Sequence, residues 1–144
     1  EAPALAELLA PQTLDLRAGA ALGEASGVTG RYRSAQVTLG NDAAIGGSVA
    51  LEGKAQKAGA PEVAFAGALT VTETIAGIAA GDTEVAPPIQ VTLTVDLARF
   101  VQRIDFSTLG GAGTVAIPAG SQAANALGRG VVNTSAYSFA WSVR

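Results

Sequence analysis

The sequence contains no cysteine, no methionine and no histidine. These absences exclude disulfide frameworks, thiolate or imidazole metal sites, cysteine nucleophiles and every catalytic triad that depends on histidine. Aromatic residues make up 5% of the chain, which leaves few platforms on which a sugar or a base could stack. Charged residues make up 15%, where about 25% is usual. The surface is therefore either made largely of small neutral side chains or covered in part by neighbouring molecules.

Positive charge is also scarce. The formal net charge is −3 and the nine cationic residues are scattered along the chain, so the sequence indicates no nucleic-acid partner. No apolar run reaches the roughly 18 residues of a spanning helix, so we expect no membrane span. Because the chain begins at Glu1 rather than at methionine, we expect that a signal peptide has been removed and that the protein is extracellular, at the cell surface. A protease product or a trimmed chain is the alternative.

What the sequence does contain is a series of short alternating runs. The 144 residues suffice for one domain with its own core. After residue 30, alternating apolar and polar runs are separated by glycine or proline, which is typical of strands. We expect strands at 31–39, 47–53, 61–73, 88–97, 100–106, 113–118 and 131–143. No helix alternates with them, which predicts an all-β fold: an antiparallel, jelly-roll-like β-sandwich of about 7–9 strands with an N-terminal arm.

Two of these runs alternate most clearly and predict the core. Their apolar side chains would share one face of a strand, while threonine, serine and glutamine face the other way. The residues expected in the core are Val91, Leu93, Val95, Leu97, Tyr137, Phe139 and Trp141.

The beginning of the chain differs from the rest. We divide the sequence into an N-terminal arm or candidate donor strand (1–17), a glycine- and alanine-rich hinge (18–30) and a β-sandwich body (31–144). Within the arm, residues 3–11 carry leucines at helical spacing between two prolines, and an extended conformation is the alternative. Residues 13–17 alternate as a strand would.

Five leucines within the first sixteen residues are the candidate assembly residues: Leu5, Leu8, Leu9, Leu14 and Leu16. In an isolated domain such a segment must fold back or remain exposed. In a polymer it can complete a sheet of the next subunit, and a contact of this head-to-tail kind generates a filament. The hinge is long enough to reach a neighbour, since thirteen extended residues span on the order of 40 Å. Docking as the first strand of the same chain is the alternative.

The order of elements also carries a resemblance. A short N-terminal segment leads into Thr13-Leu14-Asp15-Leu16, and a β-rich body ends in an aromatic strand from Tyr137 to Val143. This order resembles the secreted β-sandwich filament subunits of the TasA/camelysin and archaeal bundling-pilus families and, more loosely, the chaperone–usher pilins. The resemblance implies polymerisation by donor-strand complementation.

These observations predict a structural protein and not an enzyme. We expect a subunit of an extracellular filament or pilus, of the kind found in biofilm, whose partners are copies of itself and which needs no cofactor. A virus capsid or decoration protein with a small β-barrel or jelly roll is the first alternative. A cell-surface adhesion or carbohydrate-binding β-module is the second.

Local motifs add little chemistry. Gly110–Gly113 lacks the Lys-Ser/Thr of a phosphate-binding loop, which favours a hairpin turn. Asp42, Asp82 and Glu84 lie beside glycines and offer too few carboxylates for a calcium loop, so we expect no metal. The remaining strand carboxylates favour solvated strand faces over a glycosidase pair: Glu52, Glu62, Glu73, Asp96 and Asp105.

One modification motif is present. Asn133-Thr134-Ser135 matches the sequon for N-glycosylation, which makes Asn133 a candidate glycosylation site. The motif has a role only if the protein is secreted by an organism that glycosylates and if Asn133 is exposed.

Overall fold

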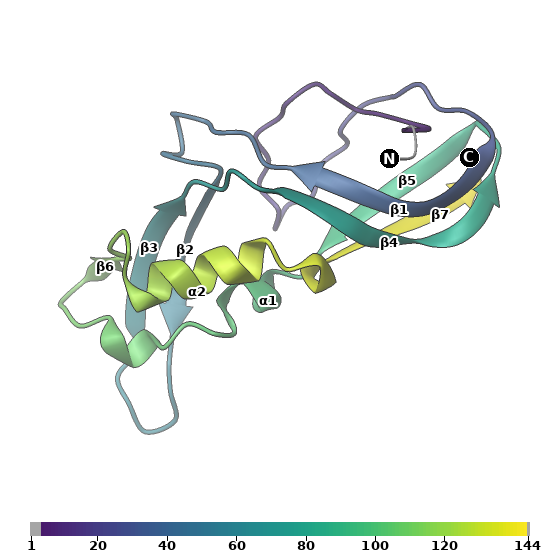
Figure 1. The fold of residues 1–144 in the computed structure, drawn as a ribbon. Coiled ribbons are helices and arrows are strands. Elements are labelled where there is room, and N and C mark those ends of the chain that lie inside the picture. The colour runs from purple at the N-terminus through teal and green to yellow at the C-terminus, as the bar shows by residue number, and fades with distance from the viewer. Residues whose placement is uncertain (1–3, 144) are drawn as a thin grey trace.

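The computed structural model describes residues 4–143, which are 40% strand and 15% helix (Figure 1). They contain seven strands: β1 (Gly30–Thr38), β2 (Val49–Ala55), β3 (Val63–Leu69), β4 (Thr74–Val85), β5 (Ile89–Val95), β6 (Thr114–Ala116) and β7 (Tyr137–Val143). The helices are α1 (Leu97–Val101) and α2 (Gln122–Val131), with short 3₁₀ helices η1 (Phe106–Thr108) and η2 (Thr134–Ala136). The mainly-β class predicted from alternation is confirmed.

Within the described residues the strands form three small sheets. β1 pairs with β4 and β5 pairs with β7, each in antiparallel fashion, while β2, β3 and β6 form a mixed sheet. In that sheet β2 and β3 are antiparallel, and β6 joins β3 in parallel. Figure 1 shows the β1–β4 and β5–β7 ribbons at one end of the molecule and the mixed sheet with the helices at the other.

The two ribbons are joined by the single tryptophan. The Trp141 ring on β7 lies 4.8 Å from the Tyr32 ring on β1, centroid to centroid. Its indole Nε1–H donates a hydrogen bond of 2.7 Å to the carbonyl oxygen of Ala80 on β4. The ring contact and the hydrogen bond together fix the distance between the ribbons. The hydrogen bond also satisfies the indole N–H, which usually needs a partner when the ring is buried.

Glycines allow β4 to bend along β1. The pairing register shifts twice, between Tyr32 and Ser34 and between Ala35 and Val37, so that β4 carries extra residues at both points. Gly77 (φ 74°) lies at one of these β-bulges and Gly81 (φ 85°) at the other. A positive φ strains most side chains but not glycine, so the two glycines that look like strand breakers in the sequence are what keeps a twelve-residue strand paired.

Both helices begin at a side-chain cap. The Asp96 carboxylate accepts a hydrogen bond from the amide of Ala98 at the start of α1, and the Ser121 hydroxyl accepts one from Ala124 at the start of α2. Such caps satisfy amide groups that have no partner within the helix. One hydrophobic cluster then joins helices, mixed sheet and β4: Phe65, Val71, Ile75, Ile78, Phe100, Ile104, Leu109, Ala123, Ala126, Leu127, Val131, Ala136 and Tyr137.

Several predicted elements are wrong or too long. Residues 100–106 form the end of α1 and a turn, because Asp96 caps a helix just before them. Residues 13–17 lead into a turn in which the amides of Ala18 and Gly19 bond the carbonyl of Asp15. The part of 3–11 that the structure describes is not helical. The strand predicted for 131–143 begins only at Tyr137, since α2 and η2 precede it.

The predicted core is confirmed only in part. Tyr137 is buried, and Leu93, Val95, Leu97 and Phe139 are half-buried against the central cluster. Trp141 is half-buried between the ribbons. Val91 is 46% exposed and was wrongly placed in the core. Alternation correctly identified β5 as a strand. The β5–β7 ribbon has only two strands, however, and the elements packed against it do not cover the whole apolar face of β5.

We expect stability to fall steeply above pH 10. Burial raises the pKa of Tyr137 from 10.0 to about 12, and its hydroxyl donates a 2.6 Å hydrogen bond to the carbonyl oxygen of Val131. The folded state therefore holds this proton more tightly than the unfolded chain does. The contribution is complete below pH 10 and is lost as the pH rises towards 12.

Urea unfolding, followed by Trp141 fluorescence between pH 8 and pH 12, measures this effect. The control is Tyr137→Phe, which cannot ionise and lacks the hydrogen bond. The native protein should start about 1 kcal/mol more stable than this variant, and the difference should shrink and change sign as the pH approaches 12, because a pKa raised by about two units contributes more than one hydrogen bond. A constant difference over the whole range would contradict the assignment.

Candidate assembly surface

The N-terminal segment, residues 4–29, precedes β1 and forms a loop closed at its base. Ala6 and Gly27 form an isolated antiparallel bridge, and the amide of Val28 donates a 3.1 Å hydrogen bond to the carbonyl oxygen of Leu5. No named strand or helix lies within residues 4–29. Residues 7–26 therefore extend from the body as a long loop instead of adding a strand to one of its sheets (Figure 1).

The predicted assembly leucines divide into two groups. Leu5 and Leu14 are half-buried, whereas Leu8 is 42%, Leu9 81% and Leu16 45% exposed. All five lie outside the central hydrophobic cluster. The structure thus brings Leu5 against the body and leaves three large apolar side chains of the same loop facing solvent.

Tyr32 holds the base of the loop. Its hydroxyl donates a hydrogen bond of 2.7 Å to the carbonyl oxygen of Val28 and lies 3.3 Å from that of Leu5. A side chain at Gly27 would meet the Ala6 side chain at 3.2 Å, so a small residue is needed where the two ends of the loop cross. The same tyrosine thereby connects the loop base to the ring contact between the ribbons.

Thr13 forms a second attachment, near the middle of the loop. Its hydroxyl donates a hydrogen bond to Oδ2 of Asp42, a residue between β1 and β2. Oδ1 of the same carboxylate accepts a 2.9 Å hydrogen bond from the amide of Ala44. The Thr13 and Ala44 hydrogen bonds hold the pKa of Asp42 below its usual value, because both favour the charged carboxylate.

β2 and β5 are among the strands with a regular edge to which another chain could add. β2 pairs with β3, and β5 with β7, each in an unbroken register, and within the described residues neither β2 nor β5 has a second strand partner. The β1–β4 ladder is interrupted by bulges on β4, which makes this ribbon a less regular template. A shallow, mainly apolar groove of about 350 Å³ runs over the outward face of β2 and β3, and is lined by Ile45, Ala50, Leu51, Glu52, Ala66, Gly67 and Ala68.

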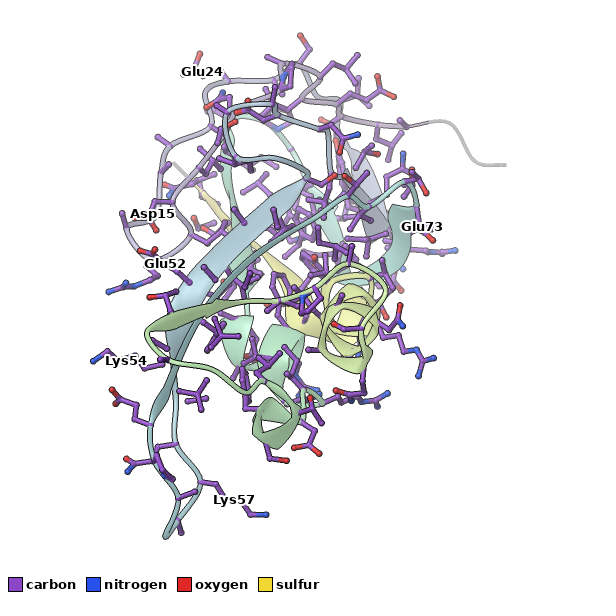
Figure 2. The ribbon with its side chains drawn as sticks, turned by 90° about the vertical axis from the view of Figure 1, so that its left-hand side faces the viewer. Asp15, Glu24, Glu52, Lys54, Lys57 and Glu73 are labelled. Carbon is purple, nitrogen blue, oxygen red and sulfur yellow. The ribbon has the colours of Figure 1, made fainter. Side chains whose placement is uncertain are left out.

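Charges are spread over the described residues, and the groove over β2 and β3 is lined by a single charged side chain, that of Glu52. Lys54 and Lys57 lie on the β2–β3 hairpin, with Lys57 near its tip, while Glu24 lies on the N-terminal segment at the opposite end (Figure 2). Lys54 forms an ion pair of 2.9 Å with Glu62. Such exposed pairs contribute little to stability, so the hairpin is held mainly by its backbone ladder.

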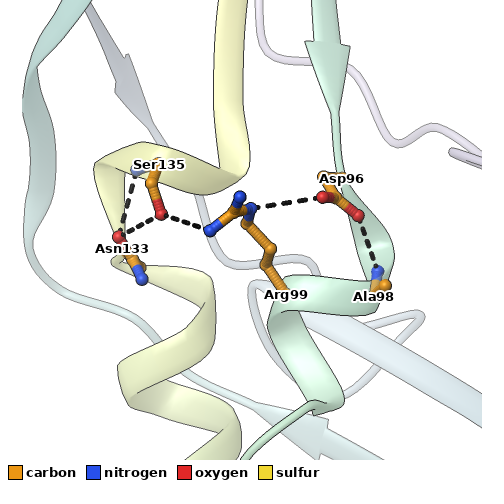
Figure 3. Close-up of polar contacts among 5 residues, drawn as sticks. All are labelled: Asp96, Ala98, Arg99, Asn133 and Ser135. Atoms are coloured by element: carbon orange, nitrogen blue, oxygen red, sulfur yellow. Dashed lines mark hydrogen bonds and ion pairs between the residues drawn. The ribbon is translucent and has the colours of Figure 1, made fainter.

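The candidate glycosylation site lies in a polar network at the end of α2 (Figure 3). The side-chain oxygen of Asn133 accepts hydrogen bonds from the amide and the hydroxyl of Ser135, at 3.0 and 2.9 Å. Arg99 donates to the Ser135 hydroxyl at 3.2 Å and pairs with Asp96 at the same distance. Asn133 is half-buried and caps η2, which is a structural reason for asparagine at this position.

The motifs that suggested catalytic or cation-binding chemistry have structural roles. Asp82, at a β4 bulge, pairs with Arg31 and Arg33 of β1. The predicted hairpin turn at Gly110–Gly113 is wrong, because the loop leads into β6, which runs parallel to β3. In the described part of the chain, no three acidic side chains gather as they would around a metal ion. No described helix is long and apolar enough to cross a membrane.

No protein-family model, curated protein or solved structure matches the chain. The geometry of the chain itself is therefore what bears on function.

Proposed function

We propose that the protein is a structural subunit of an extracellular filament or pilus, and that it polymerises with copies of itself through residues 1–17. The observation that carries this proposal is the position of Leu8, Leu9 and Leu16, which are exposed on a loop outside all three sheets. Exposed apolar side chains gathered on one segment are typical of interaction sites. The proposed role requires no catalytic group and no cofactor.

The acceptor would be a regular strand edge of the next copy, on β2 or β5. A strand added there would gain backbone hydrogen bonds, and alternate leucines would gain contacts with the acceptor. We take the β1–β4 and β5–β7 ribbons as the faces of a small sandwich and residues 1–17 as its arm. Because donor and acceptor are different surfaces, each copy can bind a further one, and the assembly grows as a filament.

Removing apolar surface from the loop should therefore weaken assembly. Burial of an exposed leucine contributes about 1.5–3 kcal/mol, so Leu8→Ala/Leu9→Ala should raise the concentration needed for assembly by at least about tenfold. Sedimentation and light scattering over a concentration series measure this shift. The matched control is Val143→Ala, because Val143 is 88% exposed but lies at the end of β7.

Equal losses in the double variant and the control would indicate unspecific adhesion and contradict the proposal. Electron microscopy of the assembled material then distinguishes the architectures. Filaments support the proposal, whereas closed shells would favour the capsid alternative.

Disulfide formation between two different chains tests exchange directly, because the native chain has no cysteine. Leu9→Cys in one chain is mixed with Ala50→Cys on β2 or Thr92→Cys on β5 in another. A mixed disulfide can form only between copies. Crosslinking of the Leu9 variant with one edge and not the other identifies the acceptor, and failure with both would overturn docking at these edges.

A further inference from the structure

The loop that contains Asp42 holds its hydrogen-bond acceptor, the Asp42 carboxylate, in a fixed position. The amide of Asp42 donates to the carbonyl of Gly47 at 2.9 Å, and the amide of Gly47 donates back at 3.2 Å. The next residue, Ser48, bonds the carbonyl of Leu69 through its amide at 2.8 Å and accepts the amide of buried Val71 at 3.0 Å through its hydroxyl. The Asp42 loop is thus fastened to the connection between β3 and β4, next to the core.

The orientation of the carboxylate follows from this loop. Because Oδ1 is bonded to the amide of Ala44, Oδ2 is turned outward, where it meets the hydroxyl of Thr13. An acceptor that is already oriented loses little freedom when the donor arrives, and this strengthens the contact. The donor, in contrast, belongs to a loop without regular secondary structure.

Thr13 lies between the exposed leucines, with Leu8 and Leu9 before it and Leu16 after it. The loop base at Ala6 and Gly27 keeps the two ends together but does not fix the middle. The Thr13 hydrogen bond therefore joins the part of the loop that carries the apolar side chains to the Asp42 loop.

We propose that the hydrogen bond between Thr13 and Asp42 is an autoinhibitory contact, which holds residues 7–26 on their own chain and slows their exchange onto a second copy. This inference rests on the proposed function. It adds that the rate of assembly is limited by release of the loop from its own chain, and not only by the affinity of the strand edge on the next copy for the loop. A chain without the contact should expose the loop more often and assemble faster.

Thr13→Val tests the proposal, because it keeps the shape of the side chain and removes the hydroxyl. The control is Thr13→Ser, which keeps the donor. Loop release is measured by limited trypsin cleavage after Arg17, the only cationic residue before Arg31. Assembly of the full chain is followed separately by light scattering. We expect Thr13→Val to accelerate both by about three- to tenfold, as for the loss of one hydrogen bond, and Thr13→Ser to leave both near the native rate.

The two readouts separate the possible failures. Native rates of both cleavage and assembly in Thr13→Val would overturn the autoinhibitory contact and leave the proposed function intact. Faster cleavage with an unchanged assembly rate would also overturn it, because release would then not limit exchange. Faster cleavage with no assembly of any variant would overturn the proposed function, and this inference with it.

Discussion

Gly130→Ala is expected to lower the free energy of unfolding by about 1–3 kcal/mol, although alanine is the better helix former. A methyl group on Gly130 would lie 2.4 Å from the carbonyl oxygen of Phe100 and 2.8 Å from that of Arg99. Both atoms belong to the backbone of α1, which cannot turn aside as a flexible side chain could. The two helices would have to separate, and the cluster around them would lose contacts. Urea unfolding followed by Trp141 fluorescence measures the change.

The same helix supplies a control of opposite sign. A methyl group on Gly128 would meet only the Leu69 side chain, at 3.7 Å, which is ordinary van der Waals contact. Gly128→Ala should therefore raise stability by up to about 1 kcal/mol through helix propensity alone. If Gly130→Ala were equally stabilising, the close approach of α1 and α2 would be contradicted.

Leu127→Ala is expected to have the largest effect of any change considered, a loss of about 2–5 kcal/mol. Leu127 is 1% exposed and lies on the buried side of α2, where the cluster joins helices and sheet. Truncation removes buried apolar area and leaves a cavity that surrounding groups fill only in part. Chemical denaturation of the purified variant gives the loss directly.

Val91→Ala serves as the comparison, because alternation predicted Val91 to be as buried as any core residue. At 46% exposure it should cost about 0.5 kcal/mol. A loss comparable to that of Leu127→Ala would mean that the outer part of β5 is covered, in contradiction to the structure.

The elements that could be predicted from sequence are those whose pattern is local. Both of the clearest alternating runs became strands, and they are partners in one ladder, in which Leu93 faces Phe139 and Val95 faces Tyr137. Period two is visible in any short stretch of sequence, since it depends only on the direction of successive side chains. How far each strand is covered depends on the neighbouring sheets, which alternation does not reveal.

Helix α2 and strand β4 were missed because glycines obscured them. The buried face of α2 recurs at the spacing of a helix, after a capping serine, in the order Ala123, Ala126, Leu127, Gly130 and Val131. That signal was present but uses small residues in place of large ones. In β4, the glycines that suggest breaks lie at β-bulges. Their structural role can be recognised only from the pairing of β4 with β1, which the sequence does not show.

For the candidate site, the sequence indicated the leucines but not what holds them. The contact of Tyr32 with Leu5 spans 27 residues and that of Thr13 with Asp42 spans 29. No local spacing relates such pairs, and tyrosine, threonine and aspartate have ordinary roles at strands and turns. Whether the leucines contact their own chain or a second copy stays a prediction that the crosslinking experiment addresses.

The pairing of β5 with β7 has a consequence for synthesis on the ribosome. Ile89 pairs with Val143, so β5 must wait more than fifty residues for its partner, and the tryptophan that joins the two ribbons arrives with that same last strand. Strand pairs that are far apart in sequence form slowly, because the chain between them loses conformational entropy before the contacts of the pair are made. The loop with the exposed leucines leaves the ribosome before any of the seven strands. During that interval it is presented to the surroundings before the body that anchors Asp42 has formed, which is when a growing chain most needs protection from its neighbours.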